Sequence, residues 1–514
     1  MAYANTDDPT SNPWTKFTSE QGLDAPQLVY LALALLLAGV SIRAITNKES
    51  KFPYVNPPKA MDLFSKACKK HFAENASTIL AHARSLYPMQ PFKMMTDAGE
   101  VIILPAQFAN EIRNEAGLHF MQTVDRDFHA SVPGFEPFAA GSNSDNLIQI
   151  TEPLSAEASF ATQLRFGTST EWQEFSLIPE ILDVVARLSS RVFLGDQLCR
   201  DEAWLEITKT YTMSAFNVAN ELRLYPTWLR SFAHWAIPGC AMLRSQVARA
   251  RTVIAPVLER RRAARQEALA AGTPVPTFND ALDWVEEETQ GRPYDSGVFQ
   301  LILSTAAIHT TTDLLSETLL QLAGRPELMA QLRQEVVEVL TASGWKKTSL
   351  FNLKLMDSVI KDAQRLKPMT IASMGRMATQ DVKLPNGETL RKGQRCLVDT
   401  SQMRDADIYE KPDEFDGYRF ERMRNDAAKQ NQAHLVSTGP AHLGFGHGQH
   451  ACPGRFFAAN EIKVALCHLI MKYDWKLAPG YTPMPLGYGF SLGVDQSAQV
   501  MVRRRTPKID IDAI

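Results

Sequence analysis

One short segment surrounds a single cysteine with residue types that suit a metal-bound thiolate. Residues 445–455 read FGHGQHACPGR, with Cys452 near the end. A thiolate bound to iron needs a tight loop, shielding from oxidants and backbone N–H groups near its charge. Gly446 permits the turn, Phe445 covers the sulfur, and Gly454 lets the next helix approach a flat macrocycle. The segment predicts Cys452 as a heme iron ligand, against the simpler alternative of a buried free cysteine.

The stretch after Cys452 has the pattern of a buried helix. Apolar residues recur with a period of roughly 3.6, as one helix face requires. A helix starting here would point its N-terminus at the sulfur and favour the thiolate. The apolar positions are Phe456, Phe457, Ile462, Leu466, Leu469 and Ile470.

The pattern Phe-x-x-Gly-x-His-x-Cys-x-Gly resembles the heme-binding loop of the cytochrome P-450 family, as found in fungal microsomal members. That family has Arg more often at the place of His450. The resemblance implies a mainly α fold with small β-sheets, and heme b with Cys452 as the axial thiolate. It also implies that His450 contacts a heme propionate, although histidine is a weaker charge partner than Arg near neutral pH.

The apolar run Val298–Leu322 lacks Pro and Gly and predicts a helix of about 37 Å. Its middle reads AAIHTT and resembles the family's oxygen-binding segment, where small residues admit dioxygen and a threonine steers protons. Thr310 is the matching threonine. The family usually has an acid before it, and this chain has His309. Two interpretations of His309 stay open: a proton relay, given its unperturbed pKa near about 6.5, or a hydrogen bond within the helix bundle.

Asp362 and Arg365 align with the family's Glu-x-x-Arg, and Arg419 resembles the later arginine that pairs with them. We expect a buried structural cluster with bidentate hydrogen bonds, from which removal of one member costs roughly 3–5 kcal/mol. The alternative is a surface salt bridge between residues one helical turn apart, worth about 0.3 kcal/mol. Since Asp replaces Glu, the shorter side chain requires a small backbone shift or a water.

Weaker matches extend the resemblance over most of the chain: 187–195 and 198–200, similar to fungal members that oxidise terpenoids and indole-diterpenes, and a hairpin signal at 384–387. A counterpart of the family's Trp-x-x-x-Arg helix, which contacts a heme propionate, is expected within 146–166, where no residue stands out. Arg376 is our candidate for that contact.

Composition narrows the classes of function. The chain has 514 residues, with 54 basic and 57 acidic side chains and a net charge of −3, so nothing indicates a nucleic-acid partner. Six cysteines show neither zinc spacing nor a disulfide framework, which fits a reducing compartment. Length alone would allow about three domains. The ordered motifs favour one large heme domain instead.

An apolar run near the N-terminus, LVYLALALLLAGVSI from Leu28, is long enough for one membrane span when extended to about 18 residues. A secretory signal is the alternative, but the residues before the run are mainly acidic. Basic residues follow it and place the rest in the cytosol. We predict a lumenal segment 1–27, a transmembrane anchor 28–45, a proline-rich hinge 46–58 and a heme-thiolate monooxygenase domain 59–514, in the endoplasmic reticulum membrane.

Periodicity predicts helices over 59–86 and 171–271, and short strands near Ile102, Val382 and Val500. The aromatic segment 224–239 has two open interpretations, a membrane-surface helix or a buried helix pair.

The resemblance implies a monooxygenase that oxidises a hydrophobic small molecule, a terpenoid, meroterpenoid or related fungal secondary metabolite. Because no flavin or nicotinamide motif is apparent, electrons would come from a separate NADPH-cytochrome P-450 reductase. We expect the pocket to be lined by 370–374 and 487–492. Lys361, Lys463 and Lys472 are candidates for docking the reductase. Two alternatives remain: a heme-thiolate isomerase or peroxide-using enzyme without external electrons, and a heme sensor or carrier.

Overall fold

The chain folds mainly into α-helices. The computed structural model describes residues 30, 34, 52–59, 62, 65–139, 151–225 and 227–514. Two compact units are present, Met1–Pro53 and Tyr54–Ile514. The helices are α2 (Lys66–Leu86), α3 (Ala109–Ile112), α4 (Met121–Phe128), α5 (Thr151–Phe166), α6 (Leu177–Leu194), α7 (Glu202–Leu222), α8 (Thr227–Ala236), α9 (Pro238–Ala271), α10 (Ala281–Thr289), α11 (Ser296–Ala323), α12 (Pro326–Ser343), α13 (Lys347–Asn352), α14 (Lys354–Leu366), α15 (Arg419–Met423) and α16 (Arg455–Lys472). Short 3-10 turns occur at Ala106–Phe108, Glu136–Phe138, Ser401–Arg404, Gln430–Gln432 and Gly448–His450.

Small sheets accompany these helices. The strands are β1 (Phe92–Thr96), β2 (Gly99–Leu104), β3 (Leu118–His119), β4 (Gln173–Ser176), β5 (Ala372–Ala378), β6 (Val382–Lys383), β7 (Thr389–Leu390), β8 (Arg395–Asp399), β9 (Tyr473–Leu477), β10 (Leu486–Tyr488), β11 (Ser491–Gly493) and β12 (Gln499–Arg504). A five-stranded sheet has the order β1-β2-β8-β5-β3, and only its β2–β8 pair is parallel. The other sheets are β4-β12-β9, β10-β11 and β6-β7. The mainly α architecture with small sheets is therefore confirmed.

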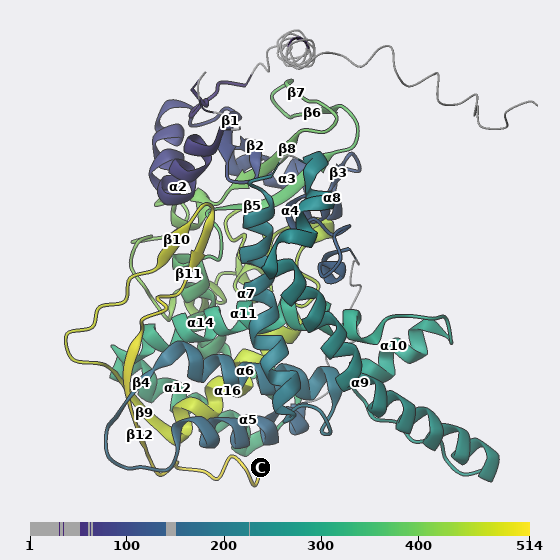
Figure 1. The fold of residues 1–514 in the computed structure, drawn as a ribbon. Helices are drawn as coiled ribbons and strands as arrows, with labels where there is room; N and C mark the ends of the chain where they lie inside the picture. Colours follow the sequence, from purple (N-terminus) through teal and green to yellow (C-terminus); the bar gives the residue numbers. More distant parts are fainter. Residues whose placement is uncertain are drawn as a thin grey trace, which may run out of the picture. The chain divides into compact units, whose positions relative to one another are not determined.

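The long helix predicted near the middle of the chain is α11. Its N-cap, Asp295, accepts a hydrogen bond from the Val298 amide at 3.0 Å, and Gly324 follows its last turn. Helices α6, α7, α9, α14 and α16 all contact it (Figure 1). Because neighbours surround it, most of α11 is buried, including polar residues such as Gln300, Asp313 and Glu317.

The structure corrects several predictions made from periodicity. Residues 173–176, predicted to be helical, form β4, because they pair with β12. The first long helix starts at Lys66 rather than at residue 59. The predicted hairpin is confirmed as β6–β7. Helix α16 is buried almost all round rather than along one stripe, and its predicted core residue Phe456 is 40% exposed.

The predicted anchor, residues 28–45, lies outside the described residues except for Tyr30 and Ala34. In the part of the chain that the structure describes, no helix combines the length and the apolar character needed to cross a membrane. The four-part domain division therefore stays a prediction.

Candidate functional site

Cys452 lies in a tight loop immediately before α16, as its surroundings in the sequence predict. The Phe445 carbonyl accepts a hydrogen bond from the Cys452 amide at 2.8 Å and closes the loop. Gly446 and Gly448 adopt left-handed conformations, with φ of 69° and 80°. Side-chain-bearing residues rarely adopt such angles, so these two glycines permit the turn. The backbone of this loop therefore fixes the position of the Cys452 thiol.

Burial and backbone dipoles act in opposite directions on the sulfur. Burial raises the pKa of the Cys452 thiol, while the N–H groups of Gly454 and Arg455 lower it. These N–H groups lie at the start of α16, whose dipole favours negative charge. The positive charge of Arg455 also lowers this pKa, and its guanidinium donates to the Cys452 carbonyl oxygen at 2.8 Å. A bound metal cation would ionise the thiol despite its burial, so the setting suits a metal ligand.

A distant segment holds the cysteine loop in place. The Gln449 amide donates to Asn114 Oδ1 at 2.9 Å, across 335 residues of sequence. A Cβ at Gly448 would lie 2.5 Å from the Arg113 Cβ and 2.6 Å from the Arg113 carbonyl oxygen. Sequence reasoning missed Arg113 and Asn114, because neither carries a local signal of so distant a partner.

Arg376 and His450 supply nitrogen donors beside this loop. The Arg376 side chain is buried in β5, and its Nη1 donates to the Gly375 carbonyl at 2.8 Å. Its Nη2 has no hydrogen-bond partner within the described ranges. The Phe120 ring centroid lies 5.6 Å from the Arg376 guanidinium carbon and 6.2 Å from the His450 ring centroid. One aromatic ring, which sequence reasoning missed, therefore adjoins both donors.

Strand β5 changes direction just before Arg376. Its pairing shifts between Ser373 and Arg376, and Met374 has a left-handed φ of 53°. Such bulges re-aim side chains near functional sites. Burial lowers the pKa of Arg376 to about 10. Burial, and then the positive charge of Arg376, lowers the pKa of His450. An anion beside the two side chains would oppose both shifts and satisfy the unpaired Nη2.

The middle of α11 carries Thr310 at a break in its burial. The Thr310 hydroxyl donates to the Ala306 carbonyl at 2.8 Å. Ala306 itself is exposed, although most of α11 is buried. Thr310 therefore keeps its hydroxyl proton on its own helix, next to small side chains.

His309 is engaged elsewhere. Its Nε2 lies 3.1 Å from the carbonyl oxygen of Lys209 in α7, and burial lowers the pKa of the imidazole. A neutral ring that donates to this carbonyl matches the bundle interpretation of His309. Its role as a proton relay stays a prediction.

Asp362, Arg365 and Arg419 meet in a buried cluster, as predicted. The Asp362 and Arg365 side chains are fully buried and that of Arg419 is 8% exposed. One carboxylate oxygen, Oδ1, accepts from Arg365 Nε at 2.6 Å and from Arg419 Nε at 2.9 Å. The other, Oδ2, accepts the backbone N–H of Asp416 at 2.7 Å. The expected bidentate pairing is wrong, because the short Asp side chain shares one oxygen between both guanidinium groups.

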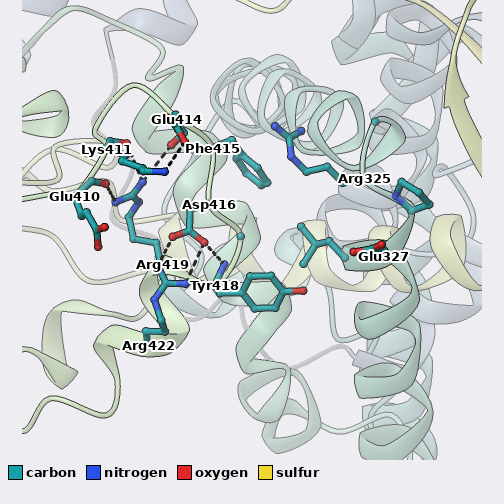
Figure 2. A pocket seen from close by; sticks show the side chains of 14 residues that line it. Arg325, Glu327, Glu410, Lys411, Glu414, Phe415, Asp416, Tyr418, Arg419 and Arg422 are labelled. Atoms are coloured by element: carbon teal, nitrogen blue, oxygen red, sulfur yellow. Dashed lines mark hydrogen bonds and ion pairs between the residues drawn. The ribbon is translucent and has the colours of Figure 1, made fainter.

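A cavity of about 650 Å³ opens beside this cluster. It lies between the start of α12 and the segment that leads into α15, and Figure 2 shows Glu327 across it from Asp416 and Arg422. Arg419 lines it, but Cys452 and Thr310 do not. This cavity is therefore separate from the cysteine loop.

The prediction that three lysines dock a reductase fails in the structure. Lys361, Lys463 and Lys472 are buried, so the prediction that they dock a reductase is wrong. Lys361, for example, donates to the carbonyls of His434 and Ser437 in the segment before the cysteine loop.

The expected counterpart of the propionate-binding helix was not found in α5. Its arginine, Arg165, donates to Glu180 at 2.6 Å. Residues 146–150 of that prediction lie outside the described residues.

The chain matches known proteins over most of its length. The family model described as "Cytochrome P450" matches residues 167–496. Relatives include "Cytochrome P450 monooxygenase eqxH" of Fusarium heterosporum, 42% identical over 92% of this chain and 94% of the relative. Another is "Cytochrome P450 monooxygenase adrA" of Penicillium rubens, which is 41% identical over 94% of this chain and 97% of the relative. The chain belongs to the cytochrome P450 family; it is a monooxygenase that binds heme with an axial cysteine thiolate.

Solved structures agree on the fold. The "cytochrome P450DA heme domain" matches with a TM-score of 0.64 and 18% identity, over 89% of this chain and 98% of that one. The "retinoic acid bound cyanobacterial CYP120A1" matches with a TM-score of 0.62 and 17% identity, over 85% of this chain and 96% of that one.

The residues present fit a heme. Cys452 offers a thiol whose sulfur faces two backbone N–H groups. Arg376 offers an unpaired, buried N–H donor suited to a propionate, with His450 near it. Thiolate and anion donors of this kind are what a heme with an axial cysteine requires.

Proposed function

We propose that this monooxygenase oxidises a hydrophobic small molecule, a terpenoid, meroterpenoid or related fungal secondary metabolite. The observation that carries the site assignment is the cysteine loop, in which Cys452 lies at the N-terminus of α16. The buried, unpaired Nη2 of Arg376 supports it independently.

Each residue of the site has a role in this proposal. Bound heme supplies dioxygen binding and activation for insertion of one oxygen atom into a C–H bond. Cys452 binds the iron, and Phe445 shields the sulfur from water. Arg376 and His450 hold the propionates by charge-assisted hydrogen bonds. Thr310 donates its hydroxyl to its own helix carbonyl and, after rotation of that hydroxyl, donates a hydrogen bond toward the reacting centre while it keeps its proton.

Two chain segments support a hydrophobic substrate. The Ile371 amide donates to the Phe490 carbonyl at 2.9 Å, and the Leu492 amide donates to the Met369 carbonyl at 2.9 Å. The segments 370–374 and 487–492 therefore adjoin, as a common pocket wall requires. Their side chains are mostly small or apolar. Apolar walls of this kind select hydrophobic ligands.

The proposed location is the endoplasmic reticulum membrane, with residues 28–45 as a single anchor and the catalytic domain in the cytosol. The apolar sequence of that run and the basic residues after it support the topology. Phe232 and Trp235 on α8 are 70% and 66% exposed, which favours the membrane-surface interpretation of segment 224–239. Electrons would come from a separate NADPH-cytochrome P450 reductase.

A second candidate is a heme-thiolate isomerase or peroxide-using enzyme. The residue before Thr310 is His309 rather than an acid, and its imidazole contacts the Lys209 carbonyl. The usual proton relay is therefore missing, which favours this second candidate. Turnover that requires NADPH and the reductase would exclude this alternative. Turnover with peroxide alone would support it.

The site assignment can be tested with the full chain in microsomes. After reduction by dithionite under carbon monoxide, native protein should show the red-shifted Soret band of a thiolate-ligated heme. Cys452→Ala should lose this band, because the thiolate is gone. Cys68→Ala is the control and should keep it, since the Cys68 thiol lies on α2 and donates to the Asn56 carbonyl oxygen.

A Cys452→Ala spectrum identical to the native one would reject the assignment. Arg376→Leu sharpens the test, and we expect it to lower the heme content while the remaining heme keeps the thiolate band.

A further inference from the structure

Basic side chains from distant parts of the chain gather where α2, α4, α7, α8 and β8 meet. We use "cationic cluster" for Lys69, Arg126, Arg223, Arg230 and Arg395. Asp97 and Asp127 are the carboxylates among them, and each interacts electrostatically with several of the cations. Five cations therefore face two carboxylates.

Arg395 forms the buried end of the cationic cluster. Its side chain is 6% exposed, and Nη2 donates to Asp127 Oδ2 at 2.6 Å. Its Nε and Nη1 have no hydrogen-bond partner among the described residues. A buried donor left unpaired is costly, and more so on a charged group. Two of the three nitrogens of Arg395 therefore lack an acceptor in the described chain, and Asp127 Oδ1 beside them lacks a donor.

Arg223 also keeps a buried nitrogen without a hydrogen-bond partner. Its Nη1 donates to Asp97 at 2.8 Å and its Nη2 to the Asp127 carbonyl at 2.8 Å. Its Nε is buried and has no partner in the described chain. Unpaired donors thus occur on two adjacent guanidinium groups, rather than on one misplaced side chain.

The remaining cations lie nearer to solvent. Arg126 is exposed and makes no hydrogen bond or ion pair within the described ranges. Burial, followed by the charge of Arg230, lowers the pKa of Lys69. Burial, followed by the charges of Arg223 and Arg126, lowers the pKa of Arg230. The cations repel one another, and the two carboxylates do not compensate for them.

An exposed apolar side chain adjoins the cationic cluster in sequence: Leu224, next to Arg223, is 61% exposed. Phe232 and Trp235 on α8 are 70% and 66% exposed, but they lie two and five residues after Arg230, on another face of that helix. A ligand with an acidic head and an apolar tail would contact the cluster and Leu224.

We propose that the cationic cluster binds the oxyanion group, phosphate or carboxylate, of an amphiphilic molecule. The oxyanion accepts the unpaired N–H groups of Arg395 and Arg223, with Lys69 and Arg126 at the solvent side. The head belongs either to a membrane lipid or to an acid-bearing small molecule. This site lies apart from the propionate donors, because Arg395 and Arg376 occupy alternate faces of the β5–β8 pair.

The test uses the purified full-length protein in neutral detergent. Its thermal unfolding midpoint is measured against inorganic phosphate, with sodium chloride at matched ionic strength as the reference. A ligand that binds the native state raises the midpoint with concentration. We expect phosphate to stabilise the native protein beyond chloride, and Arg395→Gln to weaken the apparent affinity about tenfold.

Arg391→Gln is the matched control. Arg391 is an exposed arginine four residues earlier that pairs with Asp381 at 2.6 Å, so its removal takes away one charge without touching the cationic cluster. It should respond to phosphate like the native protein. Arg126→Gln is a second variant, expected to fold normally because Arg126 is exposed, and to bind roughly threefold more weakly.

Equal responses to phosphate and chloride, or a native-like response of both Arg395→Gln and Arg126→Gln, would overturn the proposal. Two probes separate the sources of the oxyanion. Tighter binding of a short-chain phosphatidic acid than of phosphate indicates a lipid head, and tighter binding of octanoate indicates an acid-bearing small molecule. Phosphate binding without either gain would overturn the amphiphilic ligand and leave a site for free phosphate only.

Discussion

Two groups of buried arginines in this protein differ in how their hydrogen bonds are completed. Around Asp362, the guanidinium nitrogens of Arg365 and Arg419 all donate, to the carboxylate or to backbone carbonyls of the surrounding loop. In the cationic cluster, Arg395 and Arg223 keep donors without partners in the described chain. The first group is complete within the described chain, whereas the second keeps unpaired donors, which bind an oxyanion in our proposal.

In our proposals this difference separates the structural arginines around Asp362 from the ligand-binding ones. Charge alone does not distinguish them, since both groups contain buried arginines and a carboxylate. The number of unpaired donors does: Arg395 lacks acceptors for two of its three nitrogens, whereas the ion-paired Arg261 and Arg424 each lack one. Arg376 belongs with the second kind, since its Nη2 is unpaired and the heme propionates supply the acceptor in our proposal.

The largest effect should come from breaking the complete group. Asp362→Ala removes the acceptor shared by Arg365 and Arg419 and leaves two buried cations unpaired. We expect a loss of roughly 3–5 kcal/mol in the free energy of unfolding. Denaturant titration measures it. Asp413→Ala, which breaks an exposed ion pair with Arg404, is the control and should change little. A loss below about 1 kcal/mol for Asp362→Ala would mean that this cluster is not structural.

A buried acid without a charged partner should make the stability of the protein depend on pH. Glu461 on α16 accepts a hydrogen bond from Ser189 at 2.7 Å, and burial raises its pKa from 4.5 to about 8. Unlike a buried arginine, which stays charged, Glu461 can become neutral by keeping its proton, and this avoids the cost of burying a charge. Between these pH values the native state binds a proton that the unfolded state has lost. Stability should therefore fall as pH rises, with a contribution of about 1.4 kcal/mol per pH unit.

Glu461→Gln should remove this contribution, because glutamine does not titrate. Unfolding free energies measured from pH 5 to pH 8 would show a shallower decline than in the native protein. Glu267→Gln, at an exposed position on α9, should leave the slope unchanged. An identical slope in Glu461→Gln would show that Glu461 is already ionised in this range.

The smallest effect should come from the incomplete group. Arg395→Gln at low phosphate removes the partner of Asp127 but also a cation that repels its neighbours, so the two effects offset in part. We expect a smaller loss in the free energy of unfolding than for Asp362→Ala. Arg365→Gln, in the complete group, should cost several times more. Both are measured by denaturant titration in chloride buffer. Equal losses in the two variants would contradict the distinction between them.

Local motifs account for what the sequence predicted correctly. The cysteine loop, the long helix around Thr310 and the pair of Asp362 and Arg365 each lie within one element, so spacing alone reveals them. The hairpin β6–β7 was equally visible from its Pro-Asn-Gly turn.

Contacts between distant segments account for the features that the sequence did not predict. The shared oxygen of Asp362 depends on where the backbone brings Arg419, 57 residues later. His309 meets a carbonyl 100 residues earlier. Lys463 has the sequence context of a surface lysine, but its ammonium group donates to the buried Leu350 carbonyl. The cationic cluster draws on five elements, so no window of sequence contains it.

The contact between Gly448 and Arg113 has a consequence for the order of folding. Synthesis begins at the N-terminus, so Arg113 leaves the ribosome long before the cysteine loop that must settle against it. Contacts this far apart in sequence close late and slow the search for the native state. Until they close, the Cys452 thiol belongs to an unfinished chain and is open to oxidation or wrong pairing. We therefore expect heme capture to depend on how quickly the segments around Arg113 and Gly448 meet.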